Sequence, residues 1–211
     1  MVKIIGAIGD SITHGFYDDE DLGWFARLGK LILKDYPAAY VFNNLAQSGD
    51  NIADATMRAA HEVTSRQFNM IIVSLGINDL RRRKNSNLAL DFSAGTREMY
   101  WRQLLLLLKQ TGAEIIVTDL LPVIEQRYTP KAILVRKNAD VAEYNNQICR
   151  ICHDCGVKFV MRYQQWLSRP LTELYRDATH PNARGHQLIA EEMYAFLQKE
   201  RLLQPSEILY D

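Results

Sequence analysis

Five short runs of apolar residues recur along the chain, and longer segments with a different spacing of apolar positions separate them. The runs are rich in Ile and Val, as expected of strands that are buried on both faces of a sheet. We therefore predict strands over residues 3–8, 41–45, 70–75, 114–120 and 157–161.

The segments between the strands repeat apolar residues three or four positions apart, which is the spacing of an amphipathic helix. Trp24, Leu28 and Ile32 follow this spacing after the acidic stretch at residues 18–21. Strands that alternate with helices predict a parallel sheet with right-handed crossovers and helices on both faces. The other predicted helices cover residues 51–68, 91–110, 136–155 and 183–202, with Gly112 and Gly156 as C-terminal caps of the second and third of these.

Nothing in the chain marks a boundary between domains, since it has no linker rich in Pro, Gly or Ser and no internal repeat. With 211 residues it is long enough to bury a full core. We expect one domain over residues 1–211 with a loosely packed tail at residues 204–211. The longest apolar runs are too short to span a bilayer.

The charge of the chain is balanced, with 25 Lys and Arg residues against 25 Asp and Glu residues. No overall field therefore favours nucleic acid or an anionic membrane as a partner. Three cysteines, an odd number, argue against a disulfide framework. Because the N-terminus lacks the features of a signal peptide, we expect a cytoplasmic protein. An exported chain whose signal had been removed would look similar.

The first predicted strand ends abruptly at Gly9-Asp10-Ser11, which presents a hydroxyl at the carboxyl end of that strand. Ligands of open α/β sheets bind in the crevice outside the carboxyl ends of the strands. Ser11 is therefore a candidate nucleophile. The alternative is that Asp10 or Ser11 only caps the helix that follows, since both residue types are good N-caps.

A second candidate group lies near the C-terminus, where Asp177 precedes His180-Pro181 by three residues. Pro181 pushes His180 towards an extended conformation, and Asp177 can then reach one ring nitrogen of the histidine. The other ring nitrogen is left to accept a proton from a serine, which is the arrangement that activates a hydroxyl nucleophile. The alternative is a turn cap beside a surface histidine.

An acyl-transfer site also needs hydrogen-bond donors for the developing oxyanion. Gly49 follows the second strand, and without a side chain it can present its backbone N–H closely to a ligand. Asn78 follows the third strand and can present a side-chain amide. Taken singly, each could instead be an ordinary loop glycine or helix cap.

Together these motifs resemble those of the SGNH hydrolases, the GDSL-type esterase and lipase superfamily. Its four blocks occur in order as Gly9-Asp10-Ser11-Ile12, Gly49, Gly76-x-Asn78-Asp79 and Asp177-x-x-His180-Pro181. The resemblance implies a flavodoxin-like, three-layer α/β/α fold with a five-stranded parallel sheet. It also implies roles: Ser11 as nucleophile, His180 as general base and acid, Asp177 as its orienting group, and the Ser11 N–H, Gly49 N–H and Asn78 amide as the oxyanion hole.

The function expected from this resemblance is hydrolysis of a carboxylic ester by a serine mechanism. The substrate stays open among small acyl esters, acetylated sugars, lysophospholipids and thioesters. A non-catalytic flavodoxin-like binding module and an acyltransferase that uses the same serine are the alternatives. No dinucleotide fingerprint or phosphate-binding loop is present, and we expect neither a cofactor nor a metal.

Five further residues are expected to border the substrate because they adjoin these motifs or a neighbouring loop. The irregular stretch at residues 121–134 is a candidate wall of the pocket, or else a plain surface loop. The basic run at residues 81–84 could attract an anionic substrate, or could be a solvated loop. The five residues are Asp10, His14, Asp79, Arg81 and Tyr128.

Three cysteines, Cys149, Cys152 and Cys155, are spaced three apart in a predicted helix with His153 among them. The spacing superficially resembles an iron–sulfur motif, but the fourth cysteine and the following proline of that motif are missing. At helical spacing these cysteines are better explained as small hydrophobic residues. Trp101 is likewise expected in the core.

Overall fold

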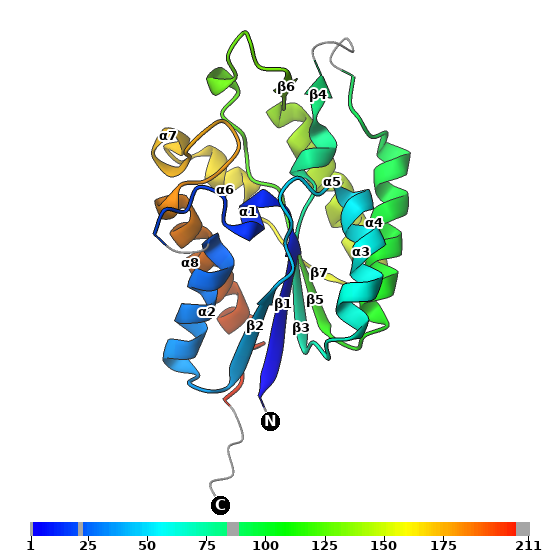
Figure 1. Cartoon of the computed structure of the whole chain (residues 1–211), viewed down its shortest axis with the longest axis vertical. Coiled ribbons are helices and arrows are strands. Elements are labelled where there is room, and N and C mark those ends of the chain that lie inside the picture. The colour runs from blue at the N-terminus through cyan, green and yellow to red at the C-terminus, as the bar shows by residue number, and fades with distance from the viewer. Residues whose placement is uncertain (1, 21–22, 84–88, 206–211) are drawn as a thin grey trace, which may run out of the picture.

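The computed structural model describes residues 2–20, 23–83 and 89–205. Five parallel strands form one sheet in the order β2-β1-β3-β5-β7 (Figure 1), which confirms the predicted five-stranded parallel sheet. This is the flavodoxin-like order, in which the chain first builds outwards on one side of β1 and then on the other. The strands are β1 (Lys3–Gly9), β2 (Tyr40–Asn44), β3 (Met70–Ser74), β5 (Glu114–Thr118) and β7 (Lys158–Val160).

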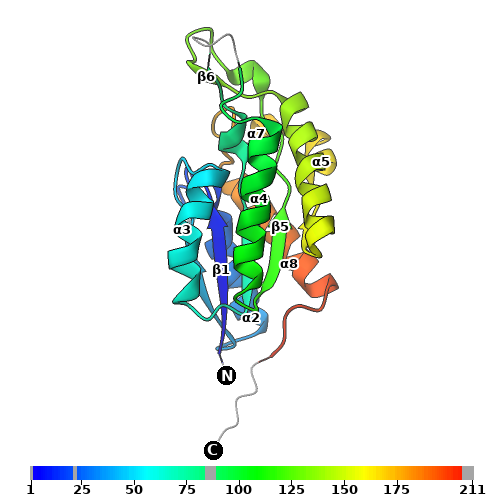
Figure 2. The same ribbon diagram turned by 90° about the vertical axis from the view of Figure 1, so that its right-hand side faces the viewer.

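Helices cover both faces of the sheet, as Figures 1 and 2 show. Side chains of one strand point alternately to the two faces, so a central strand supplies both cores. In β3, Ile71 and Val73 pack in one core, whereas Met70 and Ile72 pack in the other. The first core lies under α3 (Ile52–Thr64), α4 (Ala94–Lys109) and α5 (Asn138–Cys155), and the second under α2 (Gly23–Asp35) and α8 (Ala183–Lys199).

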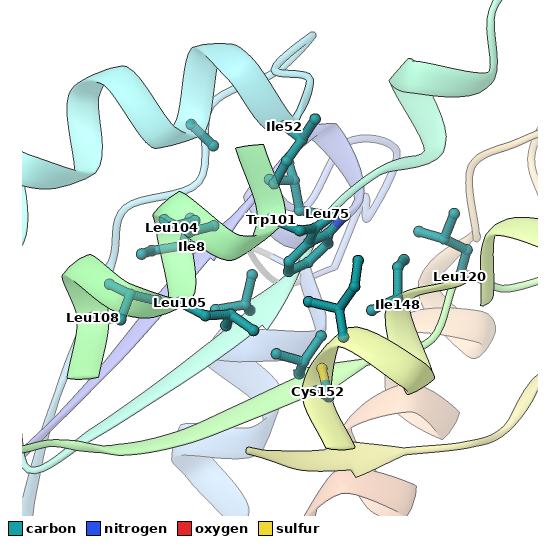
Figure 3. Packing of buried hydrophobic residues seen from close by; sticks show 14 of the residues in the cluster. Ile8, Ile52, Leu75, Trp101, Leu104, Leu105, Leu108, Leu120, Ile148 and Cys152 are labelled. Atoms are coloured by element: carbon teal, nitrogen blue, oxygen red, sulfur yellow. The ribbon is translucent and has the colours of Figure 1, made fainter. Parts of the chain in front are cut away.

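The core under α4 and α5 is drawn in Figure 3, where Trp101, Leu104 and Leu108 of α4 face Ile148 and Cys152 of α5. Trp101 is fully buried, as predicted. Burial raises the pKa of the Cys152 thiol to about 12, so this thiol is protonated near neutral pH. It therefore packs as a small hydrophobic side chain, as expected from its helical spacing.

Several helix ends differ from the prediction. The helix expected to end at a Gly112 cap ends instead at Lys109, with Gln110 as its C-cap. Gly112 adopts a φ of +75° in the turn that follows, whereas Gly156 does cap α5 in the left-handed conformation. The pattern also missed four short elements, which are α6 (Tyr163–Leu167), α7 (Leu171–Leu174) and the two-stranded pair β4 (Arg82–Arg83) and β6 (Leu134–Val135).

The C-terminal segment is held at its start. The Gln204 N–H donates to the Tyr40 hydroxyl at 2.7 Å, and this hydroxyl donates to the Gln204 carbonyl at 3.0 Å. Gln204, the first residue of the expected loose tail, is thus hydrogen-bonded although it is exposed, and residues 206–211 of that tail lie outside the described residues. Among the helices of the described residues, none has the length and hydropathy needed to cross a membrane.

Gly185, in the first turn of α8, packs too closely against α7 to tolerate a side chain. A Cβ at this position would lie 2.3 Å from the Leu174 carbonyl oxygen, whereas a Cβ at Gly95 of α4 would meet nothing closer than 4.0 Å. We predict that Gly185→Ala lowers the free energy of unfolding by about 1–3 kcal/mol. Gly95→Ala should leave it unchanged or raise it by up to about 1 kcal/mol. Urea unfolding followed by tryptophan fluorescence measures both, and equal effects would contradict the packing argument.

Candidate active site

Ser11 is the first residue of α1 (Ser11–His14), a single turn that begins where β1 ends. Asp10 caps this turn, since its carboxylate accepts the Ile12 N–H at 3.0 Å. Gly15 ends the turn in the left-handed conformation, with a φ of +100°. Both readings of Gly-Asp-Ser therefore apply at once: Asp10 is the cap, and Ser11 is presented at the carboxyl edge of the sheet.

Asp177 and His180 lie on a tight loop between α7 and α8. A bridge between Tyr175 and Pro181 closes this loop. Asp177 Oδ1 accepts the backbone N–H groups of Thr179 and His180, both at 2.7 Å. Its other oxygen lies 2.8 Å from His180 Nδ1, and His180 Nε2 lies 2.9 Å from Ser11 Oγ. The structure thus brings Ser11, His180 and Asp177 into one hydrogen-bonded chain.

This geometry keeps the carboxyl group of Asp177 ionised. Partial burial alone would raise the pKa of Asp177, but the hydrogen bonds from the His180 ring and from two backbone N–H groups outweigh it and lower the pKa to about 2. An ionised Asp177 accepts a hydrogen bond from Nδ1–H, which leaves Nε2 as the acceptor for the Ser11 hydroxyl.

Two of the expected oxyanion donors, the N–H groups of Ser11 and Gly49, have no hydrogen-bond partner among the described residues. Gly49 has a φ of +93°, a conformation that favours glycine. Asn78 lies beside it, because its Nδ2 donates to the Asp50 carbonyl at 2.9 Å. One hydrogen of this amide is thereby used and the other is left. The structure thus brings Gly49 and Asn78 together after the two strands that pair with β1, and Ser11 follows β1.

Arg136 is a site residue that the sequence reasoning missed. Its Nη2 donates to Asn78 Oδ1 at 2.8 Å and its Nε to the Ile77 carbonyl at 2.7 Å. Its Nη1 lies 3.4 Å from Thr179 Oγ1, next to His180. Because Arg136 holds the amide oxygen, the Asn78 nitrogen must face the opposite way. No local pattern could have revealed this contact, since it joins residues far apart in the chain.

Phe16 and Tyr17 form a second feature that the sequence reasoning missed. Their ring centroids lie 5.4 and 5.6 Å from that of His180, and the two residues are 44% and 41% exposed. Tyr17 has a φ of +67°, which is strained for a bulky residue. His186 holds this segment, since its Nε2 lies 3.2 Å from the Phe16 carbonyl and its Nδ1 accepts the Trp24 N–H at 3.2 Å. The site therefore has an aromatic wall beside His180.

Two residues expected to contact substrate do not face it. Asp79 is 0% exposed, and its two oxygens accept the Ile52 N–H at 2.9 Å and the Tyr144 hydroxyl at 2.6 Å. Asp10 is 2% exposed and serves as the helix cap described above. Burial raises the pKa of Asp79 to about 7 and that of Asp10 to about 6. Both carboxyl groups are therefore buried hydrogen-bond acceptors that stabilise the backbone and Tyr144 around the site.

The other three candidates lie nearer the surface. His14 Nδ1 lies 3.2 Å from the Ala46 carbonyl, and His14 lines a hollow of about 550 Å³ with residues 44–48. The Tyr128 hydroxyl lies 2.9 Å from Thr179 Oγ1, so the loop at residues 121–134 contacts the segment that carries His180. Arg81 donates to the Gly49 carbonyl at 3.0 Å. Lys84 of the same basic run lies outside the described residues.

The buried carboxyl of Asp79 predicts a pH dependence of stability. Its folded-state pKa, about 7, lies above the ordinary value of 3.8, so the folded protein binds the proton more tightly than the unfolded chain. Stability should therefore fall as the pH rises from about 4 to about 7, by on the order of 1 kcal/mol per pH unit. Asp79→Asn should flatten this decline in urea-unfolding curves, whereas Asp19→Asn, at an exposed acid, should not. Parallel curves for wild type and Asp79→Asn would contradict the assignment.

Solved structures share this fold at low sequence identity. The acetyl xylan esterase AlAXEase superposes with a TM-score of 0.75 at 19% identity, over 92% of this chain and 99% of its own. The lipase/acylhydrolase from Enterococcus faecalis gives 0.76 at 18% identity, over 98% and 100%. LAE5, an alpha/beta hydrolase enzyme from the metagenome of Lake Arreo, Spain, gives 0.75 at 22% identity, over 97% and 98%.

No curated protein sequence matches the chain significantly. The model of the GDSL-like lipase/acylhydrolase family, however, matches residues 7–188. This range begins within β1, ends within α8 and includes Ser11, Gly49, Asn78, Asp177 and His180. The chain therefore belongs to the GDSL-like lipase/acylhydrolase family and is a hydrolase of ester bonds.

Proposed function

We propose that the protein hydrolyses esters of short carboxylic acids through an acyl-enzyme intermediate on Ser11. The observation that carries the proposal is the continuous chain of contacts from Ser11 Oγ to His180 Nε2 at 2.9 Å and from His180 Nδ1 to Asp177 at 2.8 Å. A base within hydrogen-bond reach of a hydroxyl, oriented by a carboxylate, is the arrangement that activates a serine.

The reaction has two halves in this proposal. Ser11 Oγ attacks the ester carbonyl while its proton passes to His180 Nε2, and the Ser11 N–H, Gly49 N–H and Asn78 amide stabilise the oxyanion. The alcohol then leaves with the proton from His180, and Ser11 carries the acyl group. Water gives a proton to His180 and attacks the acyl-enzyme, and His180 returns that proton to Ser11 as the acid is released.

The preference for a short acyl group is supported by the close packing around Ser11. The cavity lined by its neighbours Asp10 and Ile12, and by Thr179 beside His180, measures about 20 Å³, and Ser11 itself does not line it. That volume holds about one water molecule, so this cavity offers no room for a long acyl chain. The leaving alcohol must lie near His180, where Phe16 and Tyr17 offer exposed rings. A sugar or another alcohol with an apolar face fits this wall.

The serine mechanism predicts the outcome of one variant. Ser11→Ala should lower kcat/KM for p-nitrophenyl esters by at least about 10³-fold, whereas Ser65→Ala, at an exposed serine at the end of α3, should match wild type. Along a ladder from acetyl to octanoyl esters, wild-type activity should fall as the chain lengthens. A fluorophosphonate probe should label wild type and Ser65→Ala but not Ser11→Ala.

Each alternative gives a different result in these assays. Folded wild type that neither hydrolyses any ester nor reacts with the probe would contradict the proposal and favour a binding module. Diversion of the product from acid to a new ester by excess acceptor alcohol would favour an acyltransferase. Full activity on octanoyl esters would contradict the preference for a short acyl group but not the serine mechanism.

If Arg136 positions the Asn78 amide in the oxyanion hole, a change at either residue should lower kcat. Asn78→Ala should lower kcat by about 10² to 10³, and turnover within threefold of wild type would refute its role. Arg136→Met should lower kcat by about 10- to 100-fold with little change in KM, because the amide loses its fixed orientation. Arg136→Lys should recover little, since an ammonium cannot reproduce the contacts of the guanidinium with Asn78, Ile77 and Thr179.

A double variant separates positioning from an independent role. If Arg136 acts through Asn78, the variant that carries both Asn78→Ala and Arg136→Met should have nearly the kcat of Asn78→Ala alone. Losses that multiply would show instead that Arg136 acts elsewhere, for example through its contact with Thr179 beside His180. Circular dichroism and urea unfolding of the same variants control for their folding.

A further inference from the structure

The three arginines at residues 81–83 differ in their partners. Arg82 forms two hydrogen bonds to Asp140, at 2.6 and 2.7 Å, and Arg83 pairs with Asp91 at 3.1 Å. Within the described part of the chain, the Arg81 guanidinium makes one hydrogen bond, to the Gly49 carbonyl, and no carboxylate lies within 4.0 Å of it. Arg81 is therefore the arginine of this run whose charge the described carboxylates leave uncompensated.

Arg81 lies at the proposed oxyanion hole. Its Nη2 is 3.0 Å from the Gly49 carbonyl and would lie 3.9 Å from a Cβ built on Gly49. A second cation, Arg136, holds Asn78 on the same side of the site, and among the described residues no carboxylate lies within 4.0 Å of Arg136 either. Two guanidinium groups thus flank the donors that face the ester carbonyl.

The surroundings of Arg81 disfavour its positive charge. Burial and the neighbouring charges of Arg136 and Arg83 lower the pKa of Arg81, and the carboxylates of Asp91 and Asp79 act on it only at longer range. Residues 84–88, which follow in sequence, contain no acidic residue. A half-buried cation among like charges costs free energy unless an anion accompanies it. No carboxylate that the structure describes supplies that anion within 4.0 Å of Arg81.

We propose that Arg81 binds an anionic group of the substrate, so that the preferred ester carries a carboxylate, sulfate or phosphate a few atoms from the scissile carbonyl. The inference rests on the proposed function, because it places this group at the same site. A guanidinium has five N–H donors and binds oxyanions through paired, charge-assisted hydrogen bonds. The bond to Gly49 uses one donor and holds the group in place, which leaves the others for the ligand.

Matched ester pairs test this proposal on both sides of the scissile bond. For the acyl side, mono(4-nitrophenyl) adipate is compared with its methyl ester, and for the alcohol side, 4-acetoxybenzoate with its methyl ester. Wild type should prefer the anionic member of at least one pair by about 10- to 100-fold in kcat/KM, mainly through KM. Sodium chloride at high concentration should weaken this preference.

Two variants show whether Arg81 is the source of the preference. Arg81→Gln should reduce the ratio of anionic to neutral kcat/KM by about tenfold or more. Any loss that comes from the released Gly49 loop lowers both members of a pair and leaves the ratio unchanged. Arg83→Gln removes the same charge from the same run but at a residue paired with Asp91, and should keep the ratio within about twofold.

Four outcomes would overturn the inference. Equal kcat/KM for both members of both pairs would contradict it while leaving the esterase proposal intact. A preference that survives Arg81→Gln, or one that Arg83→Gln removes equally, would show that Arg81 only positions Gly49. Wild type that hydrolyses none of the four esters would contradict the proposed function itself, and the inference with it.

Discussion

The site depends on one constraint, which is that all strands of a parallel sheet end at the same edge. Ser11 follows β1, and the two strands paired with β1 lead into Gly49 and Asn78. These three residues therefore converge whatever the helices between them contain. His180 does not follow a strand of the sheet. It lies on a loop that hydrogen bonds fix to the stretch at residues 121–134. The Ile124 N–H donates to the Ala178 carbonyl at 2.8 Å, and Arg127 donates to backbone carbonyls of the same loop.

Because of this constraint, much of the fold and the site could be predicted from the sequence. Apolar runs located the strands, and the turns and loops that follow them supplied Ser11, Gly49 and Asn78. Asp79 was misplaced because adjacency in sequence does not imply a shared direction. In the 3₁₀ turn at Ile77–Leu80, Asn78 turns towards Asp50, whereas Asp79 turns towards Ile52 and Tyr144. Neighbouring side chains of such a turn point to different sides.

Other features could not be predicted, because they depend on contacts between distant segments. Arg136 precedes α5 and looks like an ordinary surface residue in the sequence, yet it holds Asn78 and Ile77. The aromatic wall has a similar origin, since buried His186 of α8 holds the Phe16 carbonyl. Helix ends were misjudged for a local reason: the amphipathic pattern of α4 runs on past Lys109, where the backbone already turns towards Gly112.

The protonation of the carboxyl groups at the site depends on how deeply each one is buried and on its hydrogen bonds. Asp10 and Asp79 are buried, and their raised pKa values favour the neutral acid, whereas Asp177 is kept ionised by His180 and two N–H groups. Such divergence separates buried carboxyls that support the site from the ionised carboxylate that orients His180. The two cations at the strand ends, Arg81 and Arg136, have no described carboxylate within 4.0 Å. A chain with 25 basic and 25 acidic residues therefore has no net charge, yet its charges are unevenly placed around the site.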